Sequence, residues 1–334
     1  MSDDTRIGIT TTIPAEAVYA AGFIPVDCNN SFIMGPNPAA DVACAESAGF
    51  PRTICAWIKG IYGAIRRTGL RRLIGVVEGD CSETQALMDV LEREGVDVIP
   101  FAFPRARTRE AVRIEIEHLC ARLGTTYARA EDWKARLDAV RADALALDDC
   151  AWRHPGRVHG AELFTALVNT SDVRGDPASF QAECRAMAAA SASRPERPSA
   201  LRLGVAGVPG IITDLVPVAE SMGATVIYHE IPRQFALPFP GAALDEAYTA
   251  YTYPYALAAR LDDVRQEVER RRLDGIIHYV QSFCHRQLHD RLLRDALPVP
   301  VLTVEGDAPG PVDARIRTRL EAFCETLHSR RNRA

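Results

Sequence analysis

The chain has 334 residues, of which 47% are hydrophobic and 25% charged, and its formal net charge is −5. This length is about twice that of a usual single domain, so we expect two domains that each bury a core. The acidic balance offers no basic surface for a nucleic acid, and no apolar run approaches the roughly 18 residues of a membrane span. Residues 1–14 lack the basic and apolar regions of a secretory signal, which predicts a cytoplasmic protein.

The first part of the chain carries three cysteines ahead of any clear strand pattern. Cys28 and Cys44 lie in stretches that we expect to be loops. Pro51 and the apolar spacing after it predict a loop that enters a helix close to Cys55.

Residues 72–103 then show the pattern of a strand, a turn, a helix and a second strand. The strands are predicted at Leu73–Val77 and Val96–Phe101, and the helix at Glu83–Arg93. Two strands joined by a helix form a βαβ unit of a parallel sheet, with Cys81 in its first turn.

The middle of the chain, Ala130–Ala190, is helical in composition. Helices are predicted near Trp133–Leu147 and Ala161–Val168. The segment Ser191–Ser199 is rich in Pro and Ser, which favour neither a helix nor a strand, and it is predicted to be a linker.

The second half begins with another βαβ pattern. Its strands are predicted at Leu201–Ala206 and Thr225–Tyr228, separated by the turn Gly207–Gly210 and a helix that ends at Met222. The Tyr- and Pro-rich stretch Phe235–Tyr255 is expected to be a long irregular segment of the second domain, either a functional lid or a surface loop.

A third βαβ pattern follows, with strands at Gly275–Val280 and Val299–Val304 and a helix at His285–Ala296. Its cysteine, Cys284, lies eight residues after Ile276, and Cys81 lies eight residues after Leu73. From each of these cysteines to the next strand there are fifteen residues in both patterns.

These matched spacings predict an α/β protein with two similar, doubly wound (Rossmann-like) parallel-sheet domains. We place the N-terminal α/β domain at residues 1–125 and the C-terminal α/β domain at residues 198–328. A helical connecting segment and the linker fill residues 126–197.

Nine cysteines in a cytoplasmic protein are not expected to form a disulfide framework, and the spacing C-x-x-C does not occur. Cys81 and Cys284 each follow a strand and precede a helix, where unpaired N–H groups stabilise a thiolate. They are either metal ligands or nucleophiles, or small apolar residues that close a strand end. Cys55 could join them if the domains face one another, and Cys28 and Cys44 are either extra ligands or buried thiols. The remaining cysteines lie in helical patterns and are expected to be packing residues: Cys120, Cys150, Cys184 and Cys324.

Several motifs, in the same order along the chain, resemble the iron–sulfur subunits of 2-hydroxyacyl-CoA dehydratases and benzoyl-CoA reductases. The first is Thr11–Val26, which is similar to that family's Pro-Glu turn, short helix and Ala-Gly-x-x-Pro-Val signature. The closing strand, Glu-Gly-Asp turn and Arg-x-Glu-Ala-Phe helix of the family are matched by Pro300–Asp307 and Arg315–Phe323. The places where the family carries its cluster cysteines are matched by the segment around Cys55, by Gly79–Cys81 and by Ser282–Cys284.

The resemblance implies a 4Fe-4S cluster bound by Cys55, Cys81 and Cys284, with one iron open to a substrate oxygen or water. It also implies an ATP-hydrolysing activator protein that injects one electron, so that a ketyl radical forms on a CoA thioester. The expected partners are a homologous subunit or a second copy of this chain, the activator, and an acyl-CoA-type substrate. The chain has no P-loop, so ATP would act through the activator. No residue is assigned as a general acid.

Several alternatives stay open. The chain is shorter than the usual dehydratase subunits, and His285 stands where the family often has Asp, so a double-cubane-cluster reductase of small molecules is a second enzyme interpretation. A non-catalytic, cluster-bearing electron-transfer or regulatory subunit would keep the same three cysteines. His285 and His289, four residues apart on one predicted helix, could hold zinc with a third ligand, as in a hydrolase. No acidic residue is embedded in that motif, and solvated helix histidines are the simpler interpretation.

Overall fold

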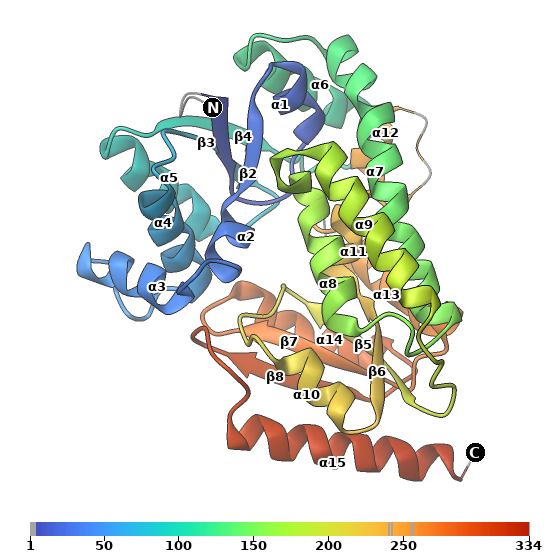
Figure 1. Ribbon diagram of the computed structural model, residues 1–334. Coiled ribbons are helices and arrows are strands. Elements are labelled where there is room, and N and C mark those ends of the chain that lie inside the picture. Colours follow the sequence, from blue (N-terminus) through green and yellow to red (C-terminus); the bar gives the residue numbers. More distant parts are fainter. Residues whose placement is uncertain (1–4, 240, 242, 255–256, 334) are drawn as a thin grey trace. The chain divides into compact units, whose positions relative to one another are not determined.

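The computed structural model describes residues 5–239, 241, 243–254 and 257–333 (Figure 1). The strands found in these ranges form two four-stranded sheets in which every neighbouring pair is parallel. Helices separate the strands along the chain. The predicted α/β class with two doubly wound parallel sheets is therefore confirmed.

The first sheet has the strand order β2-β1-β3-β4. Its strands are β1 (Arg6–Ile9), β2 (Ile24–Asp27), β3 (Arg72–Glu78) and β4 (Asp97–Ala102). Four consecutive residues of β3, from the second position onward, are buried, as expected for a strand covered on both faces.

The second sheet repeats this arrangement with the order β6-β5-β7-β8. Its strands are β5 (Leu201–Gly207), β6 (Ala224–His229), β7 (Gly275–Gln281) and β8 (Val301–Gly306). All seven residues of β7 are buried. The two sheets thus have the same order of strands, which confirms the similarity inferred from the matched spacings.

Each sheet has a topological switch point beside its first strand. The chain runs from β1 to β2 on one side and then crosses back to β3 on the other side of β1, and it does the same from β5 through β6 to β7. In open parallel sheets, ligands bind beyond the carboxyl ends of the strands at such a point. The loops after β1 and β3, and after β5 and β7, are therefore the places to look for a site.

The core of the first sheet lies under two helices, α4 (Ala56–Thr68) and α5 (Ser82–Arg93). α4 ends at Gly69, whose φ of 66° gives the left-handed cap that glycine adopts without strain. Apolar residues of both helices pack with β3 in one cluster that includes Ile58, Ile61, Leu73, Leu87 and Leu91. Further helices around this sheet are α1 (Ala15–Ala20), α2 (Cys28–Ile33), α3 (Pro38–Ser47), α6 (Arg109–Arg122) and α12 (Leu244–Ala250).

The core of the second sheet is built in the same way from apolar residues of α13 (Leu257–Arg271), α14 (His289–Ala296) and the strands. Its members include Ile227, Val264, Val268, Ile276 and Leu293. Further helices of this part are α8 (Gly160–Val168), α10 (Leu215–Ser221), α11 (Glu230–Phe235) and α15 (Ala314–Arg331).

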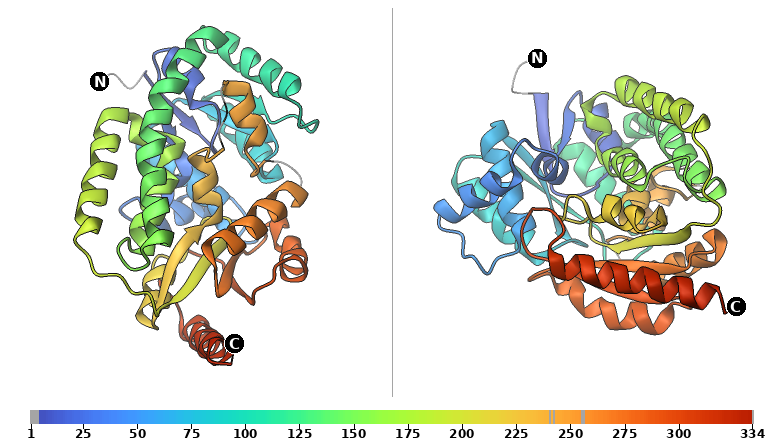
Figure 2. Two further views of the ribbon diagram at one scale, coloured as in Figure 1. Left: turned by 90° about the vertical axis from the view of Figure 1, so that its right-hand side faces the viewer. Right: turned by 60° about the horizontal axis from the view of Figure 1, so that its bottom comes forward.

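The chain divides into two compact units that are each assembled from three segments. Unit 1 consists of Met1–Ala142, Asn169–Gln181 and Phe235–Ala256. Unit 2 consists of Asp143–Val168, Ala182–Gln234 and Leu257–Ala334. Two helices contribute residues to both units, α7 (Tyr127–Arg153), which Figure 2 shows as one continuous helix, and α9 (Pro177–Ala192). The domain boundaries given above as 1–125, 126–197 and 198–328 stay a prediction.

Three local expectations were wrong. Cys28 and Cys44 lie in helices α2 and α3 rather than in loops, because Asp27 and Asn37 cap the starts of these short helices. The single helix predicted at His285–Ala296 is a 3-10 helix, η4 (His285–Leu288), followed by α14. The segment predicted to be irregular, Phe235–Tyr255, contains α12 and belongs to unit 1; residues 240, 242 and 255 of it lie outside the described residues.

Candidate functional site

The three predicted cysteines occupy the same kind of position. Cys55, Cys81 and Cys284 are the N-cap residues of α4, α5 and η4, with extended or near-extended backbones. Within the described part of the chain, none of these three thiols makes a capping hydrogen bond to its own helix. The thiols therefore lie where helix N–H groups favour negative charge, and they do not serve as caps.

Cys81 and Cys284 are topologically equivalent. Cys81 follows β3 and Cys284 follows β7, and these strands hold the same place in the two sheets, beside the switch point. The positions inferred from the sequence spacing for these two cysteines are thus confirmed. Cys81 belongs to unit 1 and Cys284 to unit 2.

Unit 1 brings Cys55 next to the helix that starts at Cys81. The backbone N–H of Cys55 donates to the carboxylate of Glu83, in the first turn of α5. Burial raises the pKa of Glu83, and the hydrogen bond from Cys55 opposes this shift. Two side-chain atoms in these first turns, Glu83 Oε2 and Trp57 Nε1, are buried without a hydrogen-bond partner among the described residues.

The turn between β3 and Cys81 is tightly enclosed. Gly79 has a φ of +91°, and a Cβ atom there would lie 2.8 Å from Cβ of Phe103 and 2.9 Å from Cβ of Pro254. The hydroxyl of Tyr253 donates to Asp80 over 3.2 Å. The segment that follows α12 thus contacts the turn that presents Cys81.

A Gly79→Ala substitution is expected to destabilise unit 1 by about 2 to 4 kcal/mol. The left-handed backbone alone costs about 1–2 kcal/mol for an L-residue, and the crowding by Phe103 and Pro254 adds to it. Gly95→Ala is the matched control, because Gly95 has a φ of +87° and nothing within 4 Å of the added Cβ. Urea unfolding of both variants measures the difference. Equal losses would mean that the enclosure of the turn carries no stability.

A buried polar segment lies close to the end of β2 in unit 1. It spans η2 (Asn169–Ser171), Asp172 and η3 (Val173–Gly175), and Val173 and Arg174 have positive φ values of 45° and 55°. Such backbone strain is concentrated at functional sites. The carboxylate of Asp172 accepts a 2.7 Å hydrogen bond from the N–H of Asp27 at the end of β2. Burial and the neighbouring Asp27 raise the pKa of Asp172 to about 7.

The sequence interpretation missed this segment, because a short run of Asn, Thr, Ser and Asp after an apolar helix looks like an ordinary surface turn. The segment is buried, and its partners are far away in the sequence: the hydroxyl of Tyr19 donates to the carbonyl of Asp172 over 2.8 Å, and the N–H of Asp27 donates to the carboxylate of Asp172.

In unit 2, a cavity of about 390 Å³ opens at the carboxyl ends of β7 and β8. Polar groups of Ser282, Glu305, Asp307 and Arg315 line it. The hydroxyl of Ser282 donates to Glu305 over 2.9 Å. Phe283, between Ser282 and Cys284, has a φ of 66° and is 51% exposed, an unusual conformation for an aromatic residue. The cavity therefore adjoins the turn that presents Cys284.

The two histidines near Cys284 lie on different helical elements. His285 lies in η4 and His289 begins α14, so they are not on one continuous α-helix. Burial lowers the pKa of both imidazoles, for His289 to about 4 with a further contribution from Arg260. Among the described residues, no group of three or more Cys, His, Asp or Glu side chains is arranged to bind a metal ion, and this holds for Cys55, Cys81 and Cys284 as well as for the histidines.

The remaining cysteines differ in burial, and Cys150, which was predicted to be a packing residue, is only half-buried. All nine cysteines are thiols. Burial raises the pKa of Cys28 and raises those of Cys120 and Cys184 to about 11. Cys44 is exposed on α3. The four cysteines predicted in helical patterns do lie in helices, namely Cys120 in α6, Cys150 in α7, Cys184 in α9 and Cys324 in α15.

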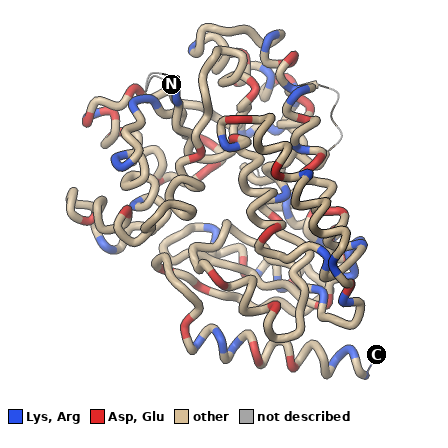
Figure 3. The backbone as a smooth tube through the Cα atoms, in the orientation of Figure 1, with Lys and Arg blue, Asp and Glu red and all other residues tan. Residues whose placement is uncertain are grey.

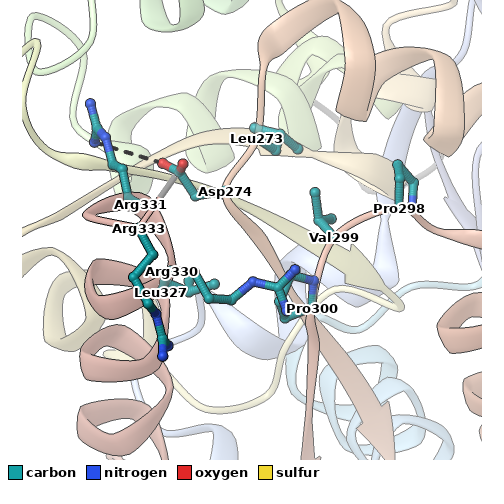
Figure 4. Close-up of a pocket in the computed structure, with 9 residues that line it drawn as sticks. All are labelled: Leu273, Asp274, Pro298, Val299, Pro300, Leu327, Arg330, Arg331 and Arg333. Atoms are coloured by element: carbon teal, nitrogen blue, oxygen red, sulfur yellow. Dashed lines mark ion pairs between the residues drawn. The ribbon is translucent and has the colours of Figure 1, made fainter.

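A second cavity in unit 2, of about 500 Å³, lies at the opposite edge of its sheet (Figure 4). It is bounded by the residues that lead into β7 and β8 and by the last turn of α15. Arg331 points toward Asp274, and their nearest side-chain atoms are 3.9 Å apart. Basic residues stabilise the C-terminal end of a helix. Elsewhere along the backbone, basic and acidic residues are interspersed (Figure 3). This cavity is remote from the carboxyl ends of the strands, so it is not part of the cysteine site.

The fold and the cysteine positions define an α/β protein that presents thiols at the switch points of two like parallel sheets. A family model described as HGD-D: 2-hydroxyglutaryl-CoA dehydratase, D-component, matches residues 10–327. The chain therefore belongs to the HGD-D family, which confirms the resemblance noted in the sequence. A search of the curated proteins found no match. The family is one of dehydratase components and is generally iron–sulfur dependent, so the chain is a component of an enzyme.

Within the described residues, no helix combines the length and the hydropathy that crossing a membrane requires.

Proposed function

We propose that this chain is the iron–sulfur subunit of an ATP-dependent radical enzyme, a 2-hydroxyacyl-CoA dehydratase or a reductase of the benzoyl-CoA type. In this proposal Cys55, Cys81 and Cys284 bind one 4Fe-4S cluster. The observation that carries it is the equivalence of Cys81 and Cys284 at the ends of β3 and β7, in a chain that belongs to the HGD-D family.

The residues present suit such a cluster. Thiolates are its usual ligands, and the three cysteines lie at helix N-termini, where the thiolate form is favoured. Burial raises the pKa of three other cysteines, Cys28, Cys120 and Cys184, and so disfavours the thiolate form that a cluster requires at those positions. When bound, a 4Fe-4S cluster supplies single electrons at low potential.

The other residues near the strand ends provide binding and orientation in this proposal. Ser282, Glu305 and Asp307 offer polar contacts in the cavity beside Cys284 for the oxygen-bearing part of a substrate. Tyr253 and Asp80 hold the turn before Cys81. The substrate is an acyl-CoA or a similar acid derivative. The partners are a homologous subunit or a second copy of this chain, together with an ATP-hydrolysing activator.

The experiment is an anaerobic purification and reconstitution of the wild-type protein, followed by iron analysis and visible absorption. We expect about four iron atoms per cluster and a brown chromophore, because a 4Fe-4S cluster absorbs visible light whereas zinc is colourless. ATP-dependent reduction of the chromophore by an added activator is the second readout. A colourless protein that binds zinc stoichiometrically would overturn the proposal.

A further inference from the structure

Glu83 links the two cysteine positions of unit 1. It lies in the first turn of α5, two residues after Cys81. Its carboxylate accepts the hydrogen bond from the backbone N–H of Cys55, the residue that begins α4. A side chain in the first turn of α5 is thus bonded to the main chain at the start of α4.

The surroundings of Glu83 favour a fixed position for its carboxylate. Glu83 is anchored in a helix whose N-terminal N–H groups favour an acidic side chain in the first turn. Cys55 is only 6% exposed, so its N–H is largely shielded from water, and a shielded N–H that lacks an acceptor is costly. Glu83 therefore satisfies a donor that solvent reaches poorly.

The second carboxylate oxygen of Glu83 is a further sign that this residue belongs to a site. Glu83 Oε2 is buried and has no hydrogen-bond partner among the described residues. Buried polar atoms of this kind are rare in folded proteins, and they occur where a water molecule or a bound group completes the site.

We propose that Glu83 is a positioning residue, which fixes the main chain at Cys55 beside the start of α5 so that the thiols of Cys55 and Cys81 bind the same group. This inference rests on the proposed function, since the group is the cluster assigned there. It assigns a role to a residue that holds no metal itself.

Two substitutions of Glu83 distinguish the loss of its hydrogen bond to Cys55 from a general loss of packing. Glu83→Gln keeps an oxygen that can accept from the N–H of Cys55, whereas Glu83→Ala removes it. Glu92→Ala is the matched control, because Glu92 lies on the same helix and is exposed. Far-UV circular dichroism and thermal melting show whether each variant is folded.

The first readout needs no iron. The metal-free protein is treated with iodoacetamide, and the modification of Cys55 is followed by mass spectrometry, with Cys81 as the internal reference. Glu83→Ala should modify Cys55 several-fold faster than wild type, because the turn around it is released. Glu83→Gln and Glu92→Ala should behave as wild type.

The second readout is iron per chain and visible absorbance after anaerobic reconstitution. Glu83→Ala should lose most of the iron, and Glu83→Gln should restore it. If Glu83→Ala matches wild type in both readouts, or if Glu83→Gln behaves as Glu83→Ala, the positioning role is wrong. If the wild type takes up no iron, the proposed function fails, while the modification rate of Cys55 still decides the role of Glu83.

Discussion

A Cys81→Ser variant, purified and reconstituted anaerobically, should lose most of its iron and its visible absorption band. Cys284→Ser and Cys55→Ser should do the same, because two thiolates hold a cubane cluster poorly. Cys81 and Cys284 occupy equivalent ends of β3 and β7, so each would supply one thiolate from its own sheet. Iron per chain and the absorption spectrum measure the effect.

The controls for these variants are buried cysteines in helices. Cys184 is 0% exposed in α9, and Cys324 is 3% exposed in α15. Replacing either by Ala should keep the iron and cost about 1 to 2 kcal/mol of packing. Iron loss on replacing Cys28 or Cys44 would instead favour a larger, double-cubane-like cluster. If all three serine variants keep full iron and colour, the likeness to the family concerns the fold and not the cluster.

An Arg271→Ala variant should lower the free energy of unfolding of unit 2 by about 3–5 kcal/mol. The guanidinium of Arg271 is fully buried and donates to Asp148 over 2.5 and 2.8 Å and to Glu267 over 2.5 Å. Removing it leaves the buried Asp148 with the longer contact to Arg233. It leaves Glu267 with Arg270 and Arg233. Losing the closest partner of a buried carboxylate is costly in a medium that solvates charge poorly. Urea unfolding monitored by circular dichroism gives the difference.

Arg270→Ala is the control for this prediction. Arg270 is the adjacent residue and also donates to Glu267, over 2.8 Å, but its side chain is 40% exposed. An exposed ion pair contributes about 1 kcal/mol or less. If the two variants lose the same stability, the burial of Arg271 does not decide its contribution.

The fold class could be predicted because the βαβ patterns are local. An apolar run, a turn, an amphipathic helix and a second run lie within about 30 residues of one another, and the equal spacing around Cys81 and Cys284 indicated two like units. The N-terminal position of each cysteine on its helix followed from the same pattern and was confirmed.

Features that depend on distant residues left no local signal. The segment Phe235–Tyr255 was assigned to the second domain, within residues 198–328, yet Pro254 contacts Gly79 in unit 1. Glu83 entered the sequence analysis only as the first residue of a predicted helix, since nothing near it in the sequence shows that Cys55 donates to it. The helices at Cys28 and Cys44 were missed because Asn, Gly and Pro are frequent around them, although Asp27 and Asn37 are good capping residues.

Because the segments of the two units alternate along the chain, unit 1 cannot be completed before much of unit 2 has been synthesised. Domains usually fold from the N-terminus as the chain leaves the ribosome, at about 5–20 residues per second. Unit 1 receives its last segment only with Ala256, after β5 and β6 of unit 2 have already been made. From Ala142 onward the first sheet therefore waits on the order of ten seconds for its remaining parts. A nascent chain halted at Ala142 would carry the whole first sheet with Cys55 and Cys81, but not Tyr253 and Pro254, which contact the turn before Cys81.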